Sequence, residues 1–210
     1  MPEHTDQAEV PSIRPSICLG SRDWDLPGWV GSYYPPDLPT DWRLTYYAND
    51  FSLVLVPQGR WVGAGPERGR AWRNEVSERF RFYLELSDLQ PWALKRLPRW
   101  ADALGTCLGG ILVSGARGLE LDSGYGGAFF QALSVTDPTA LSRLPTGPRP
   151  VAVVTTTRAL GSLREQRSLF SALVGRFGAQ GPIPVFVNGD PPPARVLLDA
   201  RELTQLMGLA

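Results

Sequence analysis

Four aromatic side chains that could bind a ligand follow the first apolar run of the chain. Trp24, Trp29, Tyr33 and Tyr34 share a loop that also contains glycines and prolines. The faces of indole and phenol rings bind nucleobases, sugars and cations, so these residues could line the mouth of a ligand site. In the alternative, the rings plug one end of the fold or pack against a helix that carries Trp42. The sequence leaves both open.

Polar side chains that could act on a ligand stand where strands are predicted to end. Glu85 is the candidate for a catalytic acid or a metal ligand. A single carboxylate paired with an arginine is more often structural, and that alternative stays open. Gln58, Arg60 and Asn188 also follow predicted strands, where they could orient a ligand or contact an anion.

Histidine chemistry is not expected, because the single histidine, His4, lies in the polar N-terminal region. Nucleophilic triads usually need an imidazole base, and most catalytic zinc sites use at least one histidine. Acid–base work would therefore fall to carboxylates, Tyr, Cys or the only lysine, Lys95. We predict no metal site and no cofactor. Cys18 and Cys107 are expected to be free, buried thiols in a reducing cytoplasm.

Two segments resemble anion sites but lack their chemistry. Residues 188–190 precede the last predicted helix, where barrels often bind phosphate on exposed N–H groups. Prolines at 191–193 remove three of those donors, and Asp190 adds repulsion, so phosphate is not expected there. Residues 115–127 are glycine-rich, but they match neither a Walker loop nor a dinucleotide fingerprint. We interpret them as a loop.

Charge patterning argues against nucleic-acid and membrane partners. The 210 residues include 21 Lys plus Arg and 21 Asp plus Glu, so the formal net charge is zero. Acidic residues interleave with the one basic cluster, which predicts a solvated, salt-bridged surface. The cluster contains Arg60, Arg68, Arg70 and Arg73, and the acids are Glu67, Glu75 and Glu78.

The composition predicts one globular domain after a disordered tail. Residues 1–15 are polar and form the predicted tail, and residues 16–210 form the domain. The first sixteen residues lack the apolar segment of a secretory signal, and no run approaches the roughly 20 apolar residues of a membrane span. A cytoplasmic protein is expected.

Short apolar runs predict about seven strands alternating with helices. The expected strands cover residues 17–19, 51–56, 80–86, 111–113, 128–135, 151–156 and 183–187. This alternation favours a parallel sheet with right-handed crossovers. The chain is short for a closed eight-stranded barrel, so an abbreviated or incomplete TIM-type (β/α) barrel fits, with a doubly wound sheet as the alternative.

Capping residues and apolar spacing predict the helices between these strands. Thr40 could cap a helix that begins near Asp41, and Ser162 with Glu165 forms a capping box for a helix that ends at Gly178. Residues 88–104 are helical in spacing but divided by a proline, and another helix follows residue 193. Residues 59–73 are predicted to be a Gly- and Arg-rich connection.

The N-terminal motifs resemble those of the YecE-like family, also called domain of unknown function 72. Members typically read G-T-S-G-W and then W-x-G-x-F-Y-P after the first strand; here residues 20–24 read GSRDW and residues 29–35 read WVGSYYP. The resemblance extends over residues 16–88 and 182–208 and is weak between them. It implies a TIM-type barrel with its site at the carboxyl ends of the strands.

The chain departs from the family pattern where members carry polar groups. Leu55 and Pro57 stand in place of an acid and an asparagine on the second strand, and Glu85 replaces a lysine on the third. Gly189 replaces a second asparagine after the last strand, and two motifs that contain histidine have no counterpart. The resemblance therefore implies a member that has lost or exchanged its polar centre.

Two functions follow from these observations. The first is a non-catalytic binding or assembly protein, with a homo-oligomer or a protein partner expected because missing strands would leave an edge uncovered. The second is an enzyme, a hydrolase or isomerase, that uses Glu85 with Arg60, Gln58 or Asn188 on a small phosphorylated or sugar-like substrate. A small-molecule ligand is compatible with both.

Overall fold

The computed structural model describes residues 14–87, 89–114, 128–136, 151–189 and 194–210. Most of the predicted tail, the glycine-rich segment at 115–127 and the prolines at 191–193 lie outside the described residues.

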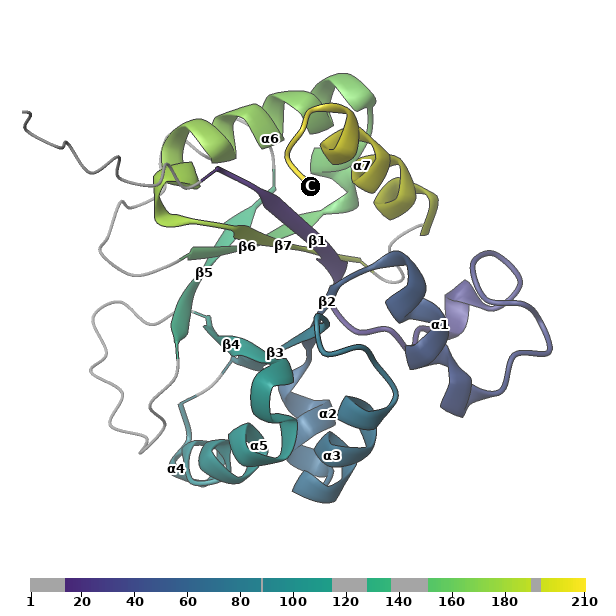
Figure 1. Cartoon of the computed structure of the whole chain (residues 1–210), viewed down its shortest axis with the longest axis vertical. Coiled ribbons are helices and arrows are strands. Elements are labelled where there is room, and N and C mark those ends of the chain that lie inside the picture. The colour runs from purple at the N-terminus through teal and green to yellow at the C-terminus, as the bar shows by residue number, and fades with distance from the viewer. Residues whose placement is uncertain (1–13, 88, 115–127, 137–150, 190–193) are drawn as a thin grey trace, which may run out of the picture.

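Seven parallel strands form one sheet that curves into a ring (Figure 1). The strand order is β1-β7-β6-β5-β4-β3-β2, and every predicted strand is present, with ends that shift by up to three residues. This arrangement is a nearly closed barrel, so the doubly wound alternative is wrong. The strands are β1 (Ile17–Ser21), β2 (Leu53–Val56), β3 (Arg81–Leu86), β4 (Leu108–Val113), β5 (Phe129–Val135), β6 (Val151–Thr156) and β7 (Ile183–Asn188).

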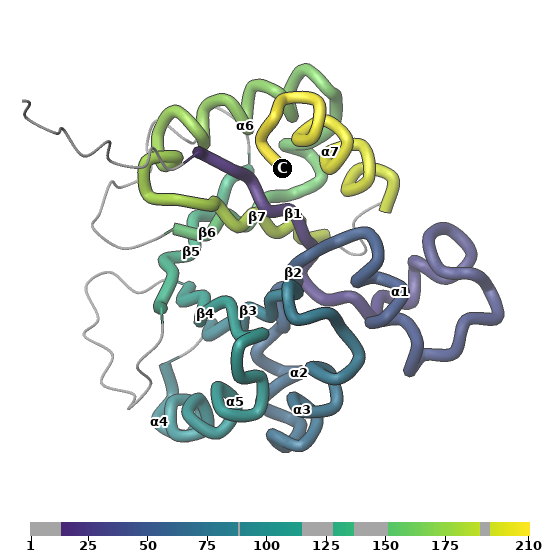
Figure 2. The backbone as a smooth tube through the Cα atoms, viewed as in Figure 1, coloured from purple at the N-terminus to yellow at the C-terminus, as the bar shows by residue number. Residues whose placement is uncertain are grey.

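Helices cover two opposite sides of the ring, as the backbone path shows (Figure 2). α6 and α7 lie beside β1 and β7, whereas α2 to α5 lie beyond β3 and β4, and α1 lies outside β2. None of the helices in the described parts of the chain has both the length and the apolar character that crossing a bilayer requires. The bounds are α1 (Arg43–Asp50), α2 (Gln58–Gly63), α3 (Pro66–Asn74), α4 (Pro91–Leu94), α5 (Leu97–Leu104), α6 (Leu163–Phe177) and α7 (Ala194–Leu206).

Two helical predictions need correction. Residues 59–73 form α2 and α3 rather than a connection, because buried Trp61 and Trp72 pack on Trp100 of α5, with ring centroids 6.1 and 5.4 Å apart. The glycines of this segment hid that signal. Thr40 does not cap a helix, since it begins a short 3-10 turn and α1 starts at Arg43. The cap of α6 is confirmed, with Ser162 Oγ accepting from the Glu165 N–H.

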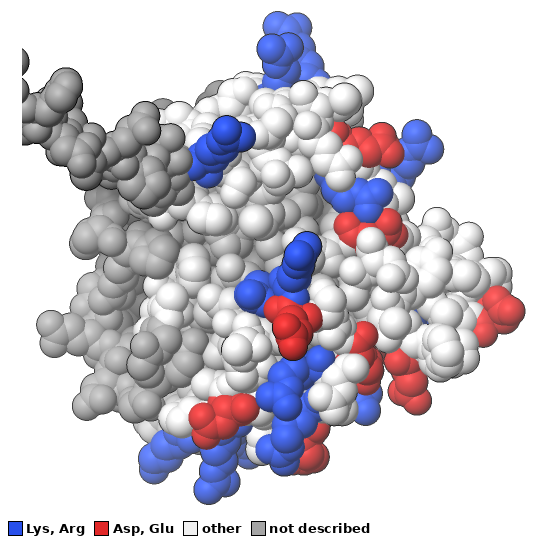
Figure 3. Space-filling model, in the orientation of Figure 1, with Lys and Arg blue, Asp and Glu red and all other residues white. Residues whose placement is uncertain are grey.

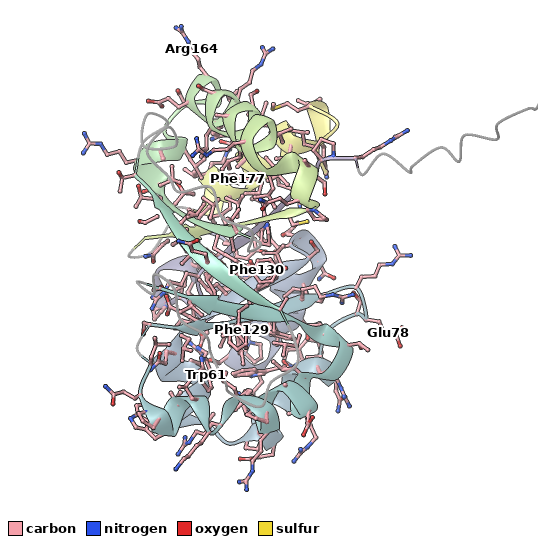
Figure 4. The ribbon with its side chains drawn as sticks, turned by 90° about the vertical axis from the view of Figure 1, so that its left-hand side faces the viewer. Trp61, Glu78, Phe129, Phe130, Arg164 and Phe177 are labelled. Carbon is pink, nitrogen blue, oxygen red and sulfur yellow. The ribbon has the colours of Figure 1, made fainter. Side chains whose placement is uncertain are left out.

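Apolar side chains fill the interior of the barrel. The Tyr83 ring lies 5.3 Å from that of Phe130 and 5.2 Å from that of Phe186, and Leu55 and Leu112 close the same cluster. Figure 4 shows Phe130 beside Phe129 on β5, with Trp61 and Phe177 in the helical layers on either side.

Two glycines make room for these interior rings. A Cβ at Gly109 would lie 2.5 Å from the Tyr83 ring, and a Cβ at Gly110 would lie 2.5 Å from the Phe130 ring. Both glycines therefore belong to β4. The strand predicted over residues 111–113 therefore starts three residues earlier, at Leu108.

The ring closes where β1 and β2, the two ends of the sheet, meet, and we call this contact the seam. Side-chain hydrogen bonds add to the few backbone contacts there. Among the described residues, one isolated bridge, from Arg22 to Leu55, joins the two strands. Further along the seam, the buried Tyr47 hydroxyl accepts from the Ser21 N–H and donates to the Leu53 carbonyl, each at 2.9 Å. Burial raises the pKa of Tyr47, so the hydroxyl keeps the proton that it donates.

The strands also approach each other closely at this seam. A Cβ at Gly20 would lie 2.2 Å from the Leu53 carbonyl oxygen, so a larger residue would push β1 and β2 apart. Among the described residues, the outer edges of β1 and β2 therefore meet at one bridge and at the Tyr47 hydroxyl, without a regular ladder.

The Tyr47 bridge can be tested by removing its hydroxyl. Tyr47→Phe should lower the free energy of unfolding by about 2 kcal/mol, because it leaves one N–H and one C=O of the seam buried without a partner. Chemical denaturation measures the change. Tyr46→Phe is the matched control, since the neighbouring Tyr46 hydroxyl has no hydrogen bond among the described residues and its loss should change stability by less than about 0.5 kcal/mol. Equal effects of the two variants would contradict the bridge.

Candidate functional site

The polar centre of the molecule lies at the carboxyl ends of β1, β2 and β3. Arg22 directly follows β1, Gln58 begins α2 just after β2, and Glu85 is the penultimate residue of β3. Neighbouring strands of a parallel barrel bring such residues together at one end, where barrel proteins carry their sites.

Glu85 is held by Arg22 in a two-pronged ion pair. The Nε of Arg22 lies 3.0 Å from Oε1 and 3.2 Å from Oε2 of the carboxylate, and its Nη2 lies 2.8 Å from Oε2. The Gln58 N–H adds a long contact of 3.4 Å to Oε2. Glu85 is only 8% exposed, so both carboxylate oxygens face donors in a largely buried setting. This pair raises the pKa of Arg22 further above its usual value.

Gln58 and Trp61 attach α2 to the end of β3. The Gln58 Oε1 accepts from the Ser87 N–H at 2.7 Å and from the Ser87 hydroxyl at 3.1 Å, and the Trp61 Nε1–H donates to the Glu85 carbonyl at 2.8 Å. These bonds fix the backbone of Glu85 beneath its ion pair. Gln58, predicted to orient a ligand, is 7% exposed here.

A chain of alternating charges continues from Asp23. Its φ is 72°, in the left-handed region that Asp tolerates better than most residues. The Asp23 carboxylate accepts from the Trp24 and Asp25 N–H groups through Oδ1 and from the Arg60 Nε through Oδ2, at 2.9 Å. Arg60 also approaches Asp25 at 3.6 Å, and Asp25 pairs with Arg43 at 2.6 Å.

Arg60 thus belongs to this centre and not to the basic cluster in which the sequence placed it. No ion pair within 4 Å joins Arg68, Arg70 or Arg73 to the acids around them among the described residues, so the salt-bridged surface predicted for them is not found. Figure 3 shows basic and acidic side chains interspersed on the visible face of the molecule.

The aromatic residues of the opening loop lie mainly in the core. Trp24, Trp29 and Tyr34 are at most 4% exposed, while Tyr33 is half-buried and its hydroxyl donates to Asp50 at 3.0 Å. Burial raises the pKa of both tyrosines well above the usual range. This placement agrees with the packing alternative, since few ring atoms remain for a ligand to contact.

Each of these rings packs on another aromatic ring. Trp29 stacks on Tyr47 of the seam, Trp24 meets Trp72 edge to face, and the Arg60 guanidinium lies 5.0 Å from the Trp24 ring centre. The aromatic cluster therefore joins the seam to the charged centre.

Asn188 lies at the end of β7, beside Arg22. Ser21 pairs with Val187 in register, and the Arg22 N–H donates to the Val187 carbonyl at 3.0 Å, so the next pair across the strands is Arg22 and Asn188. Asn188 lies two residues after the interior residue Phe186 on β7, so the two side chains share the inner face of the barrel. Asn188 is half-buried there.

Sequence reasoning predicted Glu85, Gln58, Arg60 and Asn188 but missed Arg22 and Asp23. Their position directly after the first strand could have identified Arg22 and Asp23 as site residues. They lie in the motif GSRDW, of which the sequence analysis considered only the aromatic residue. No group of three or more metal-binding side chains is gathered in the described parts of the chain.

Known proteins resemble the chain in sequence motif and in fold. The family model described as "Protein of unknown function DUF72" matches residues 18–89, about a third of the chain. No curated protein matches it. The crystal structure of a DUF72 family protein from Thermotoga maritima is similar with a TM-score of 0.65 and 12% identity, covering 92% of this chain and 99% of that one. One from Enterococcus faecalis gives 0.57 and 15%, covering 90% and 95%. Identities this low establish the fold alone.

A double-mutant cycle measures the Arg22–Glu85 pair. Arg22→Gln, Glu85→Gln and the double variant should give a coupling energy of about 1–2 kcal/mol in unfolding, because the carboxylate is largely buried and both oxygens are engaged. The matched control is the exposed pair of Arg195 and Asp199 on α7, with an expected coupling below about 0.5 kcal/mol. A coupling at Arg22–Glu85 no larger than the control would contradict the geometry.

Proposed function

We propose that this chain, whose residues 18–89 match the DUF72 family model and whose fold is similar to that of DUF72 proteins, is a non-catalytic binding protein. The ligand is a small molecule that binds at the carboxyl ends of β1 to β3 and leaves chemically unchanged. The family itself has no established activity, so the proposal rests on the geometry of this chain.

The observation that carries the proposal is the engagement of both Glu85 carboxylate oxygens by Arg22. A general acid must carry a proton to the substrate, and a general base must offer it a free lone pair at hydrogen-bond distance. Here both oxygens of Glu85 accept from Arg22, and the Gln58 N–H approaches one of them. These contacts hold the largely buried carboxylate against the Arg22 guanidinium, so Glu85 is suited to positioning Arg22 rather than to transferring protons.

The packing of the interior supports a shallow site. Leu55, Leu112 and Phe186 are fully buried directly below the charged layer, and the Tyr83 ring contacts Phe186. A ligand would therefore rest on the rim of the barrel and not enter it. A shallow, charged rim suits reversible binding, whereas catalysis generally needs a site that excludes water.

We do not extend the proposal to an oligomer. The homo-oligomer or protein partner expected from the sequence stays a prediction, since β1 and β2 meet at the seam through one bridge and the Tyr47 hydroxyl among the described residues.

Exposure of the protein to a metabolite extract tests binding against catalysis. Wild-type protein incubated with the extract and separated by gel filtration should retain a small molecule that mass spectrometry recovers unchanged. Arg22→Gln should retain less of it, and Arg195→Gln, which removes one positive charge from the exposed surface of α7, should retain as much as the wild type.

The same extract reveals an enzyme if there is one. Loss of a metabolite with appearance of a product, abolished by Glu85→Gln but not by Arg195→Gln, would contradict the proposal and support the hydrolase or isomerase alternative.

A further inference from the structure

We infer that Arg22 and Arg60 form a binding site for a small oxyanion, a carboxylate or a phosphate, at the rim of the barrel. This inference rests on the proposed binding function and names the chemical class of its ligand. Glu85 and Asp23 act as positioning residues that hold the two guanidinium groups.

The Arg22 guanidinium is bound along one edge and open along another. A guanidinium has five N–H donors in a planar fork and can pair bidentately along two different edges. Glu85 occupies the edge formed by Nε and Nη2. Nη2 uses one of its N–H groups on Glu85, and Nη1 makes no hydrogen bond among the described residues. The outward N–H groups of Nη1 and Nη2 have the spacing of carboxylate and phosphate oxygens.

Arg60 is held in a similar way. Its Nε donates to Asp23 Oδ2 at 2.9 Å, and its Nη1 lies 3.6 Å from Asp25, beyond hydrogen-bond distance. The face of the guanidinium is supported by the Trp24 ring at 5.0 Å. The terminal nitrogens of Arg60 therefore make no hydrogen bond within the described part of the chain, although Nη1 stays within ion-pair distance of Asp25. The contacts that fix the side chain use Nε and the face of the guanidinium.

The cations at this rim are more exposed than the acids that hold them. The side chain of Arg22 is 35% exposed against 11% for Glu85, and that of Arg60 is 30% exposed against 15% for Asp23. The formal charges of each pair cancel, but the positive end of each pair faces the solvent. A ligand at the rim would meet the guanidinium groups first, with the carboxylates behind them.

The neighbouring strands add neutral polar groups on the inner face. Asn188 is next to Arg22 across β1 and β7, and Thr156 pairs with Asn188 across β6 and β7. Ser134 follows the interior residue Ala132 on β5 by two positions and is exposed. These amide and hydroxyl groups do not repel an anion, and they can donate hydrogen bonds to it.

The fixed orientation distinguishes this site from a pair of surface arginines. An anion that binds a freely moving arginine must pay the entropy of ordering the side chain, whereas Arg22 and Arg60 are already ordered by ion pairs. Affinity should therefore depend on the guanidinium fork and on its carboxylate anchor, and not only on positive charge.

Isothermal titration with inorganic phosphate and, separately, with succinate tests the inference and distinguishes the two anion classes. The wild type should bind at least one of them, with a dissociation constant below 10 mM as an order of magnitude for two charge-assisted contacts at an open site. Arg22→Lys keeps the charge but loses the fork, so the same anion should bind at least about tenfold more weakly. Arg195→Lys is the control and should bind as the wild type does.

Glu85→Gln tests the positioning role. The substitution removes a negative charge from the rim and also removes the anchor of Arg22. If the fixed orientation of Arg22 determines affinity, the anion should bind several-fold more weakly. If net charge alone determined affinity, the anion would bind more tightly. Circular dichroism spectra and unfolding curves confirm that each variant is folded.

Three results would overturn the inference: no binding of either anion by the wild type, equal binding by Arg22→Lys, or tighter binding by Glu85→Gln. A neutral molecule retained from the metabolite extract, without anion binding, would overturn this inference and leave the proposed function standing.

Discussion

The hydroxyl of Tyr47 closes the barrel, and the polar centre depends on that closure. β1 and β2 meet without a regular ladder, so one phenol bridges the Ser21 N–H and the Leu53 carbonyl where backbone bonds are missing. Closing the ring places Arg22, at the end of β1, across β2 from Glu85 on β3. The ion pair in turn spans the seam. The fold and the site therefore depend on each other: closure of the seam brings Arg22 and Glu85 together, and their ion pair holds the seam closed.

Local sequence patterns predicted the strands well and the seam not at all. The segment Leu53–Val56 is apolar along its whole length, as strands buried on both faces usually are, and each predicted run became a strand. Ring closure is a property of the whole sheet, and nothing near Tyr47 in the sequence indicates that its hydroxyl reaches two strands. α2 and α3 were missed because Gly59, Gly63 and Gly69 weaken a helical pattern that packing of Trp61 and Trp72 restores.

The location of the candidate site could be predicted from the sequence, but the ion pairs within it could not. Strand ends pointed to Glu85, Gln58, Arg60 and Asn188, since parallel strands deliver their carboxyl ends to one rim. Which charges neutralise which depends on side-chain positions that only the folded chain fixes. Glu85 stands where the family motif has lysine, and its partner Arg22 stands where the motif has serine. Of the departures from the motif, Glu85 therefore has a charged partner at the end of β1.

Amide hydrogen exchange at Ser21 tests the closure of the barrel most directly. The Ser21 N–H donates to the Tyr47 hydroxyl, and the next amide, that of Arg22, donates to the Val187 carbonyl inside the sheet. If the phenol replaces a ladder bond, the two amides should show protection of the same order, since both would open only with the barrel. Exchange at Ser21 at the rate of an exposed amide, with Arg22 still protected, would contradict the account.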